Sequence, residues 1–239
     1  MISLLYNVGN FLEYIFEFGD PLYLARNYKI AKLLIKNGAD PIGGYRGSDE
    51  IPTILHHLCF TRSKGAMQAV LESGTPVNIP NSLGKTPMFY APNSDIVDLL
   101  FNAGHSVDWE DITGFRPLHH KVNEIVCNEN LLTVKALLDA KCDPNAEDSK
   151  GRTPLHIVCL QGKARSHDDN RSEVLQNRLD TIKLLADYGA RFTAEDNEGK
   201  TPFDCLYIPR SEADFPEWKV IADYLIEKFD AQVNHGFKK

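Results

Sequence analysis

The sequence predicts an all-α solenoid of helix–turn–helix units joined by short β-hairpin loops. A first observation is internal repetition, since segments of similar sequence occur at residues 84–89, 114–119, 151–156 and 199–204. A second is constant spacing. In each case 12 residues separate the closing position of an apolar run from the third residue of the next segment. Repetition of this kind is typical of stacked units, none of which can bury its apolar face alone.

Each part of the repeated unit has a physical reason. Thr153 followed by Pro154 is a favourable helix start, because the hydroxyl can bind free N–H groups and proline suits the first turn. An apolar run such as Ile182–Leu185 buries one face of a second helix, and Gly189 can end it in the left-handed conformation. The 12-residue link then forms a hairpin loop. Polar turn residues stand at equivalent positions of these loops: Asn81, Asp111, Asp148 and Asp196.

These segments resemble the ankyrin repeat, which has a T-P-L-H-x-A motif and a period of about 33 residues. The best copy is at residues 151–156, a weaker copy is at 53–56, and a remnant is at 20–25. The resemblance predicts an N-terminal capping helix over 1–19 and about five repeats over 20–200. It also predicts a divergent C-terminal capping repeat and tail over 201–239. The expected repeat starts lie near residues 20, 53, 86, 116 and 153.

Several positions depart from the pattern. Lys141 replaces a closing glycine, while Phe89 and Asp204 replace the motif histidine. An insertion within 161–179 lengthens the fifth repeat, and its second helix is expected to start near residue 169 or 170. Such an insertion either binds something or is a tolerated surface loop.

Composition restricts the classes of function. The 239 residues carry a net charge of −7, which argues against nucleic-acid binding and against adsorption to an anionic membrane. The five cysteines form no CxxC pair and are expected to be reduced thiols. This predicts an intracellular protein, cytoplasmic or nuclear. No stretch reaches the roughly 18 apolar residues of a membrane span, so membrane insertion is not expected.

Sequence patterns that can indicate a nucleotide-binding, metal-binding or catalytic site have a structural explanation in this chain. The Gly-Lys-Thr runs at 84–86 and 199–201 imitate the end of a phosphate-binding loop but lack its first glycine. His56 with Cys59, and His156 with Cys159, have i, i+3 spacing, yet the resemblance makes the histidines hydrogen-bonding residues of inner helices. We therefore expect no enzyme activity, cofactor or metal, and keep a Cys/His site on the concave face as an alternative.

The resemblance implies a non-enzymatic scaffold that binds another protein through hairpin tips and the concave face of the inner helices. We expect a monomer. One interpretation is an effector that an intracellular bacterium or virus deploys in the host cytoplasm, and an alternative is an adaptor that links two partners. Trp109 and Phe115 are the strongest candidates because exposed aromatic anchors dominate interface energies, although Trp109 could instead pack between loops. The candidate partner-binding residues are Trp109, Ile112, Phe115, Tyr45, Arg152, Lys85, Lys150 and Lys200.

Overall fold

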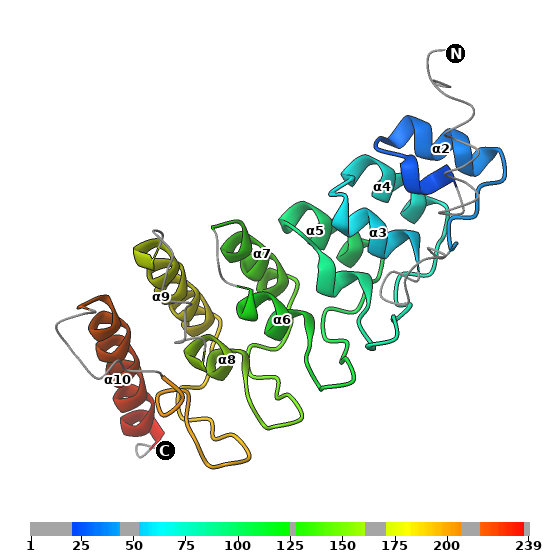
Figure 1. Ribbon diagram of the computed structural model, residues 1–239. Helices are drawn as coiled ribbons and strands as arrows, with labels where there is room; N and C mark the ends of the chain where they lie inside the picture. Colours follow the sequence, from blue (N-terminus) through cyan, green and yellow to red (C-terminus); the bar gives the residue numbers. More distant parts are fainter. Residues whose placement is uncertain (1–20, 44–52, 125–127, 161–170, 207–215, 237–239) are drawn as a thin grey trace. The chain divides into compact units, whose positions relative to one another are not determined.

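The computed structural model describes residues 21–43, 53–124, 128–160, 171–206 and 216–236 (Figure 1). The chain divides into two compact units, residues 1–106 and 107–239, each of which is described by itself. All regular structure in the described segments is helical, and none of their residues lies in a β-strand. The predicted all-α class is therefore confirmed.

The first unit is a stack of two helical layers. Second helices α2, α4 and α5 pack in succession, and the first helix α3 packs against η2 on one side and η3 on the other. Asparagine side chains start two of the second helices, because Asn27 and Asn93 accept hydrogen bonds from Ile30 N (3.0 Å) and Ile96 N (3.1 Å). The described elements are η2 (Pro21–Leu24), α2 (Tyr28–Lys36), α3 (Ile54–Phe60), α4 (Lys64–Glu72), η3 (Pro87–Tyr90) and α5 (Ser94–Asn102).

The first helix of the repeat near residue 86 is only a four-residue 3₁₀ helix, η3. Pro92 follows it closely, and a proline disfavours the helical conformation in the residue before it. Ala91 accordingly has φ −55° and ψ 116°. Phe89, which replaces the motif histidine, is fully buried, so an apolar contact takes the place of the hydrogen bond.

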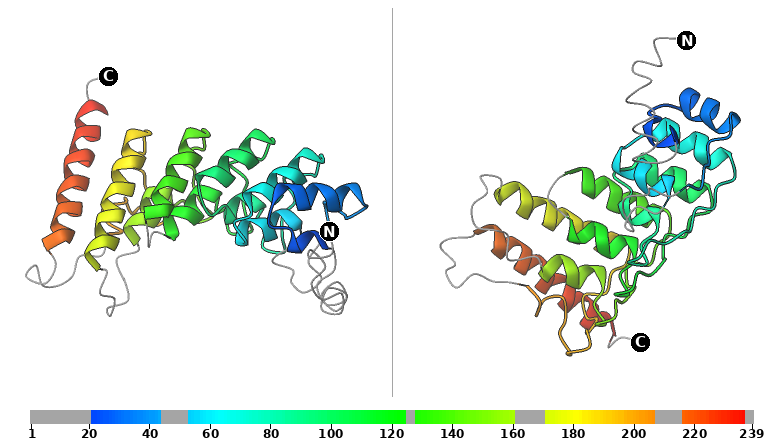
Figure 2. Two further views of the ribbon diagram at one scale, coloured as in Figure 1. Left: turned by 90° about the horizontal axis from the view of Figure 1, so that it is seen from above. Right: turned by 45° about the vertical axis from the view of Figure 1, so that its right-hand side comes forward.

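The second unit repeats the same arrangement. First helices α6 and α8 pack together, while α7, α9 and α10 form a second layer in which α9 contacts both neighbours (Figure 2). In this unit α6 and α8 lie between the second helices and the loops (Figure 1). Its described helices are α6 (Pro117–Asn123), α7 (Asn128–Asp139), α8 (Pro154–Leu160), α9 (Arg171–Asp187) and α10 (Pro216–Gly236).

The closing position after α2, α4, α5, α7 and α9 is left-handed whether or not it is glycine. Gly104 and Gly189 have φ values of 87° and 88°. Lys141, the departure from the pattern, has φ 69° and keeps the same conformation. The geometry of the unit therefore overrides the preference of the lysine residue for negative φ.

The last part of the chain differs from the other repeats. Residues 202–205 form turns rather than a helix. Asp204, which replaces the motif histidine, accepts hydrogen bonds from Thr201 Oγ1 (2.6 Å) and Thr201 N (2.9 Å). The long α10 then packs on α9. The expected capping helix over 1–19 and residues 161–170 of the insertion lie outside the described residues, and 171–179 belong to α9.

Candidate functional site

The loops between repeats share one hydrogen-bonded frame. In the first loop of the second unit, Asp111 Oδ1 accepts from Thr113 N (2.8 Å) and from Phe115 N (3.0 Å). Asp111 N in turn donates to Phe115 O over 2.8 Å. This confirms the predicted turn residues, and it fixes the backbone so that the tip side chains project from a rigid support. Equivalent bonds surround Asn81, Asp148 and Asp196.

Neighbouring loops of the second unit are joined to one another through their backbones. Ser149 N donates to Thr113 O (3.2 Å), and Asn197 N donates to Lys150 O (2.9 Å). The approach is close at Gly114, where an added Cβ would lie 2.5 Å from Ser149 N. The three loops therefore present their tips side by side.

Two predicted residues meet on this surface. The guanidinium carbon of Arg152 lies 5.8 Å from the centre of the Phe115 ring, within the range of a cation–π contact. The Phe115 ring also stacks on His119, with centroids 5.5 Å apart and planes inclined by 30°. Phe115 is half-buried as a result, so only part of its ring is accessible to a partner.

Arg152 is held in place by a carboxylate. Its Nε and Nη2 atoms donate to Asp148 Oδ2 over 2.8 and 2.6 Å. Burial opposes ionisation of Asp148, but the hydrogen bonds from Arg152 and from Lys150 N outweigh it, and the pKa of Asp148 is lowered. Arg152 thus reaches the surface with its orientation fixed and its charge balanced.

Ile112 and Trp109 differ in exposure. Ile112 is 71% exposed at the tip of its loop. Trp109 is half-buried. The most accessible apolar group of this loop is therefore the isoleucine, although the sequence pointed first to the aromatic residues.

The remaining candidates are distributed along the chain. Lys150 and Lys200 are exposed on the next two loops, and Lys200 Nζ pairs with Glu198 at 2.7 Å. Lys85 belongs to the first unit and is half-buried. Tyr45 lies outside the described residues. The candidates that the structure brings together are thus those on the loops of the second unit.

Ion pairs that the sequence analysis did not identify balance much of the positive charge on these loops. Besides the Asp148–Arg152 pair, Arg116 lies 2.7 Å from Glu110 Oε1 and 3.8 Å from Asp108 Oδ1. The i, i+4 spacing of Asp148 and Arg152 was a signal that could have revealed the first of these pairs.

The histidines with motif spacing occupy buried, hydrogen-bonded positions. His156 Nδ1 accepts from Thr153 N (3.1 Å), so Nε2 carries the proton and donates to Lys200 O (3.0 Å). Burial lowers the pKa of His56, the equivalent residue of the first unit, to about 4. Burial likewise raises the pKa of the Cys159 thiol to about 12. A thiol in that state is a poor nucleophile near pH 7.

In the part of the chain that the structure describes, no group of three or more His, Cys, Asp or Glu side chains is placed to hold a metal ion. None of the helices found there combines the length and apolar character needed to cross a membrane.

Comparisons with known proteins agree with the repeat pattern. No family model matches the chain. It is 32% identical to the mouse B-cell lymphoma 3 protein homolog over 141 residues, which cover 56% of this chain and 30% of that protein. It is 28% identical over 138 residues to L86 of Acanthamoeba polyphaga mimivirus, covering 56% of this chain and 20% of that protein. The chain thus spans less than a third of the length of these two relatives.

The comparison with FPV223 of fowlpox virus (strain NVSL), which is named as an ankyrin repeat protein, covers more of the relative. The two chains are 31% identical over 113 residues, which are 46% of this chain and 76% of the viral protein. The repeated segments, the loop frames and this similarity lead to one conclusion: the chain belongs to the ankyrin-repeat protein family.

Proposed function

We propose that the protein is a non-enzymatic interaction scaffold whose second unit binds a partner protein through its loop tips. Its ankyrin-repeat relatives support a protein–protein interaction scaffold in general. The observation that carries the specific proposal is the exposure of Ile112, an apolar side chain that is 71% accessible on a rigid loop. Phe115 and Arg152 form the adjoining part of this loop-tip surface.

The energetics of such a surface favour binding. Burying an isoleucine side chain contributes about 1.5 to 3 kcal/mol. The backbone of the loop is already fixed by Asp111, and Arg152 by Asp148, so little conformational entropy remains to be lost on association. We infer a partner with a small apolar pocket for Ile112 and a polar rim near Lys150.

The biological setting is part of the proposal. FPV223 and L86 are ankyrin repeat proteins of viruses, which supports an effector acting in the host cytoplasm. A regulator in the cytoplasm or nucleus of its own cell is the alternative. We propose a monomer that binds neither nucleic acid nor a membrane.

The test is quantitative affinity capture with the wild-type chain and with Ile112→Glu. The control is Val220→Glu, because Val220 is also exposed (53%) but lies on α10. The expected result is a partner that both wild type and the control enrich and that Ile112→Glu loses, with thermal unfolding unchanged. Equal enrichment by all three chains would place binding elsewhere.

A further inference from the structure

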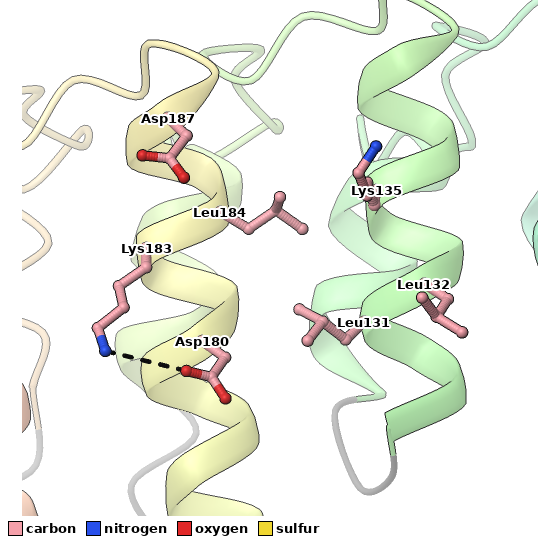
Figure 3. A pocket seen from close by; sticks show the side chains of 7 residues that line it. All are labelled: Leu131, Leu132, Lys135, Asp180, Lys183, Leu184 and Asp187. Carbon is pink, nitrogen blue, oxygen red and sulfur yellow. Dashed lines mark ion pairs between the residues drawn. The ribbon is translucent and has the colours of Figure 1, made fainter.

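We infer that the second unit has another binding surface, a groove between α7 and α9 that takes a short peptide segment with an aliphatic side chain near a basic one. The groove has a volume of about 220 Å³. Leu131 on α7 and Leu184 on α9 point toward one another across it (Figure 3). It lies on the second-helix layer, with α6 and α8 between it and the loop-tip surface (Figure 1).

The apolar floor indicates what kind of group the groove holds. Leu131 and Leu184 are half-buried, and Leu132 is 60% exposed. A volume of about 220 Å³ is smaller than the roughly 300 to 1,000 Å³ of ordinary ligand pockets. It suits one or two aliphatic side chains of a peptide better than a whole small molecule.

The charges at one end of the groove favour a basic group. Both helices end there on an aspartate, Asp139 in α7 and Asp187 in α9, and neither has a basic residue in its last turn. The negative end of a helix dipole favours cations, so an aspartate at that position is electrostatically unfavourable.

The two aspartates are not equivalent. Asp139 is neutralised by Lys135, whose Nζ lies 2.6 Å from Oδ2, and it also accepts a hydrogen bond from the Tyr188 hydroxyl. At the other end of the groove, Lys183 Nζ lies 4.0 Å from Asp180 Oδ1. Among the described residues, Asp187 forms no ion pair, and it is exposed. The lining therefore offers one uncompensated carboxylate beside an apolar floor, which complements a lysine or arginine of the peptide.

This surface is independent of the loop tips. If both surfaces bind, the protein can join two partners, as the adaptor alternative requires. A failure of one proposal leaves the other in place, because the variants that test them carry different substitutions.

The test uses random 12-residue peptides displayed on phage and selected on the full chain. The peptides enriched are expected to share a Leu, Ile or Met near a Lys or Arg. A synthetic copy of the most enriched peptide is then titrated against three variants. Leu132→Glu is expected to weaken binding about tenfold or more, because it places a charge at the apolar edge of the groove.

Leu33→Glu is the matched control, because Leu33 is 59% exposed on a second helix of the first unit. It is expected to bind like wild type. Asp187→Lys is expected to weaken binding about two- to fivefold at low salt, and less at high salt. The inference is overturned if nothing is enriched, if acidic peptides are selected, or if Leu132→Glu binds as well as Leu33→Glu. It is also overturned if sedimentation shows that the wild-type chain is a dimer and that Leu132→Glu makes it a monomer, since a second copy of the chain would then occupy the groove.

Discussion

His156 Nε2 lies 3.0 Å from the carbonyl oxygen of Lys200, a residue of the following loop. His119 makes the same bond to Arg152 O (3.1 Å), and His56 makes it to Lys85 O (3.0 Å). Each of these histidines therefore connects a first helix to the loop of the next repeat. The bond needs a proton on Nε2. In His119 and His156, Nδ1 accepts a hydrogen bond from a backbone N–H at the start of its own helix, so these two rings are neutral, while His56 Nδ1 lies 2.8 Å from Thr53 Oγ1.

We expect the folded protein to lose stability in mild acid because some of its histidine rings are buried. Burial lowers the pKa of His56 and of His105 to about 4, from the ordinary value of 6.5. Between those pH values the unfolded chain binds more protons than the folded chain, so stability is complete above pH 6.5 and decreases as the pH falls toward 4. At pH 5, His56 alone is expected to lower the free energy of unfolding by about 1 to 3 kcal/mol relative to pH 7.5.

Urea unfolding at the two pH values measures this effect. The His56→Gln variant is the control, since its amide does not titrate and the side chain remains polar. The variant is expected to be less stable than wild type at pH 7.5 and to lose less stability on going to pH 5. An equal loss in both proteins would show that His56 does not contribute to the acid sensitivity.

Because neighbouring loops approach closely at Gly114 but not at Gly199, we expect alanine to lower the stability of the protein by different amounts at these two glycines. Gly114 and Gly199 have φ values of 77° and 73°, so a side chain is strained at both. At Gly114 an added Cβ would also lie 2.5 Å from Ser149 N, whereas no atom lies within 4 Å at Gly199. Gly199→Ala is expected to destabilise by about 1 to 2 kcal/mol, and Gly114→Ala by about 2 to 5 kcal/mol. Similar unfolding midpoints for the two variants would mean that the loops do not pack as closely as described.

The fold could be predicted because its signal is local. A constant 12-residue spacing and polar turn residues such as Asp148 can be seen in a single stretch of sequence, and the loop frames confirm them. The short η3 helix was not predicted, although Pro92 gave a signal for it. The environment of Phe115 was harder to predict from the sequence, because it depends on Arg152, which belongs to the next repeat. The exposure of Ile112 was likewise a matter of tertiary structure, since it follows from the path of the whole loop.

The left-handed Lys141 predicts a stabilising substitution. Its φ of 69° is unfavourable for a residue with a side chain, whereas the equivalent Gly104 adopts 87° without strain. Lys141→Gly is expected to raise the free energy of unfolding by about 0.5 to 1 kcal/mol, because the relief of strain exceeds the extra entropy of glycine in the unfolded chain. The reciprocal Gly104→Lys is expected to destabilise by a similar amount, as measured by urea unfolding. A loss of stability in Lys141→Gly would show that the lysine side chain makes a compensating contact.

Asp148 has two roles that substitutions can separate. Its Oδ1 accepts from the backbone N–H groups of Lys150 and Arg152, and its Oδ2 accepts from the Arg152 guanidinium. An asparagine can keep the first role, as Asn81 does in its own loop, but it removes the charge from the second. Asp148→Ala leaves two N–H groups without their acceptor and is expected to destabilise by about 1 to 3 kcal/mol.

Asp148→Asn is expected to lose less stability than Asp148→Ala, but to release Arg152 from its fixed orientation beside Phe115. Partner binding at the loop tips should therefore weaken in both variants, although only the alanine variant is substantially destabilised. Thermal unfolding and affinity capture, each carried out on wild type, Asp148→Asn and Asp148→Ala, distinguish the two roles. If Asp148→Asn binds the partner like wild type, the orientation of Arg152 is not needed for recognition, and Ile112 alone would be left as the anchor of that surface.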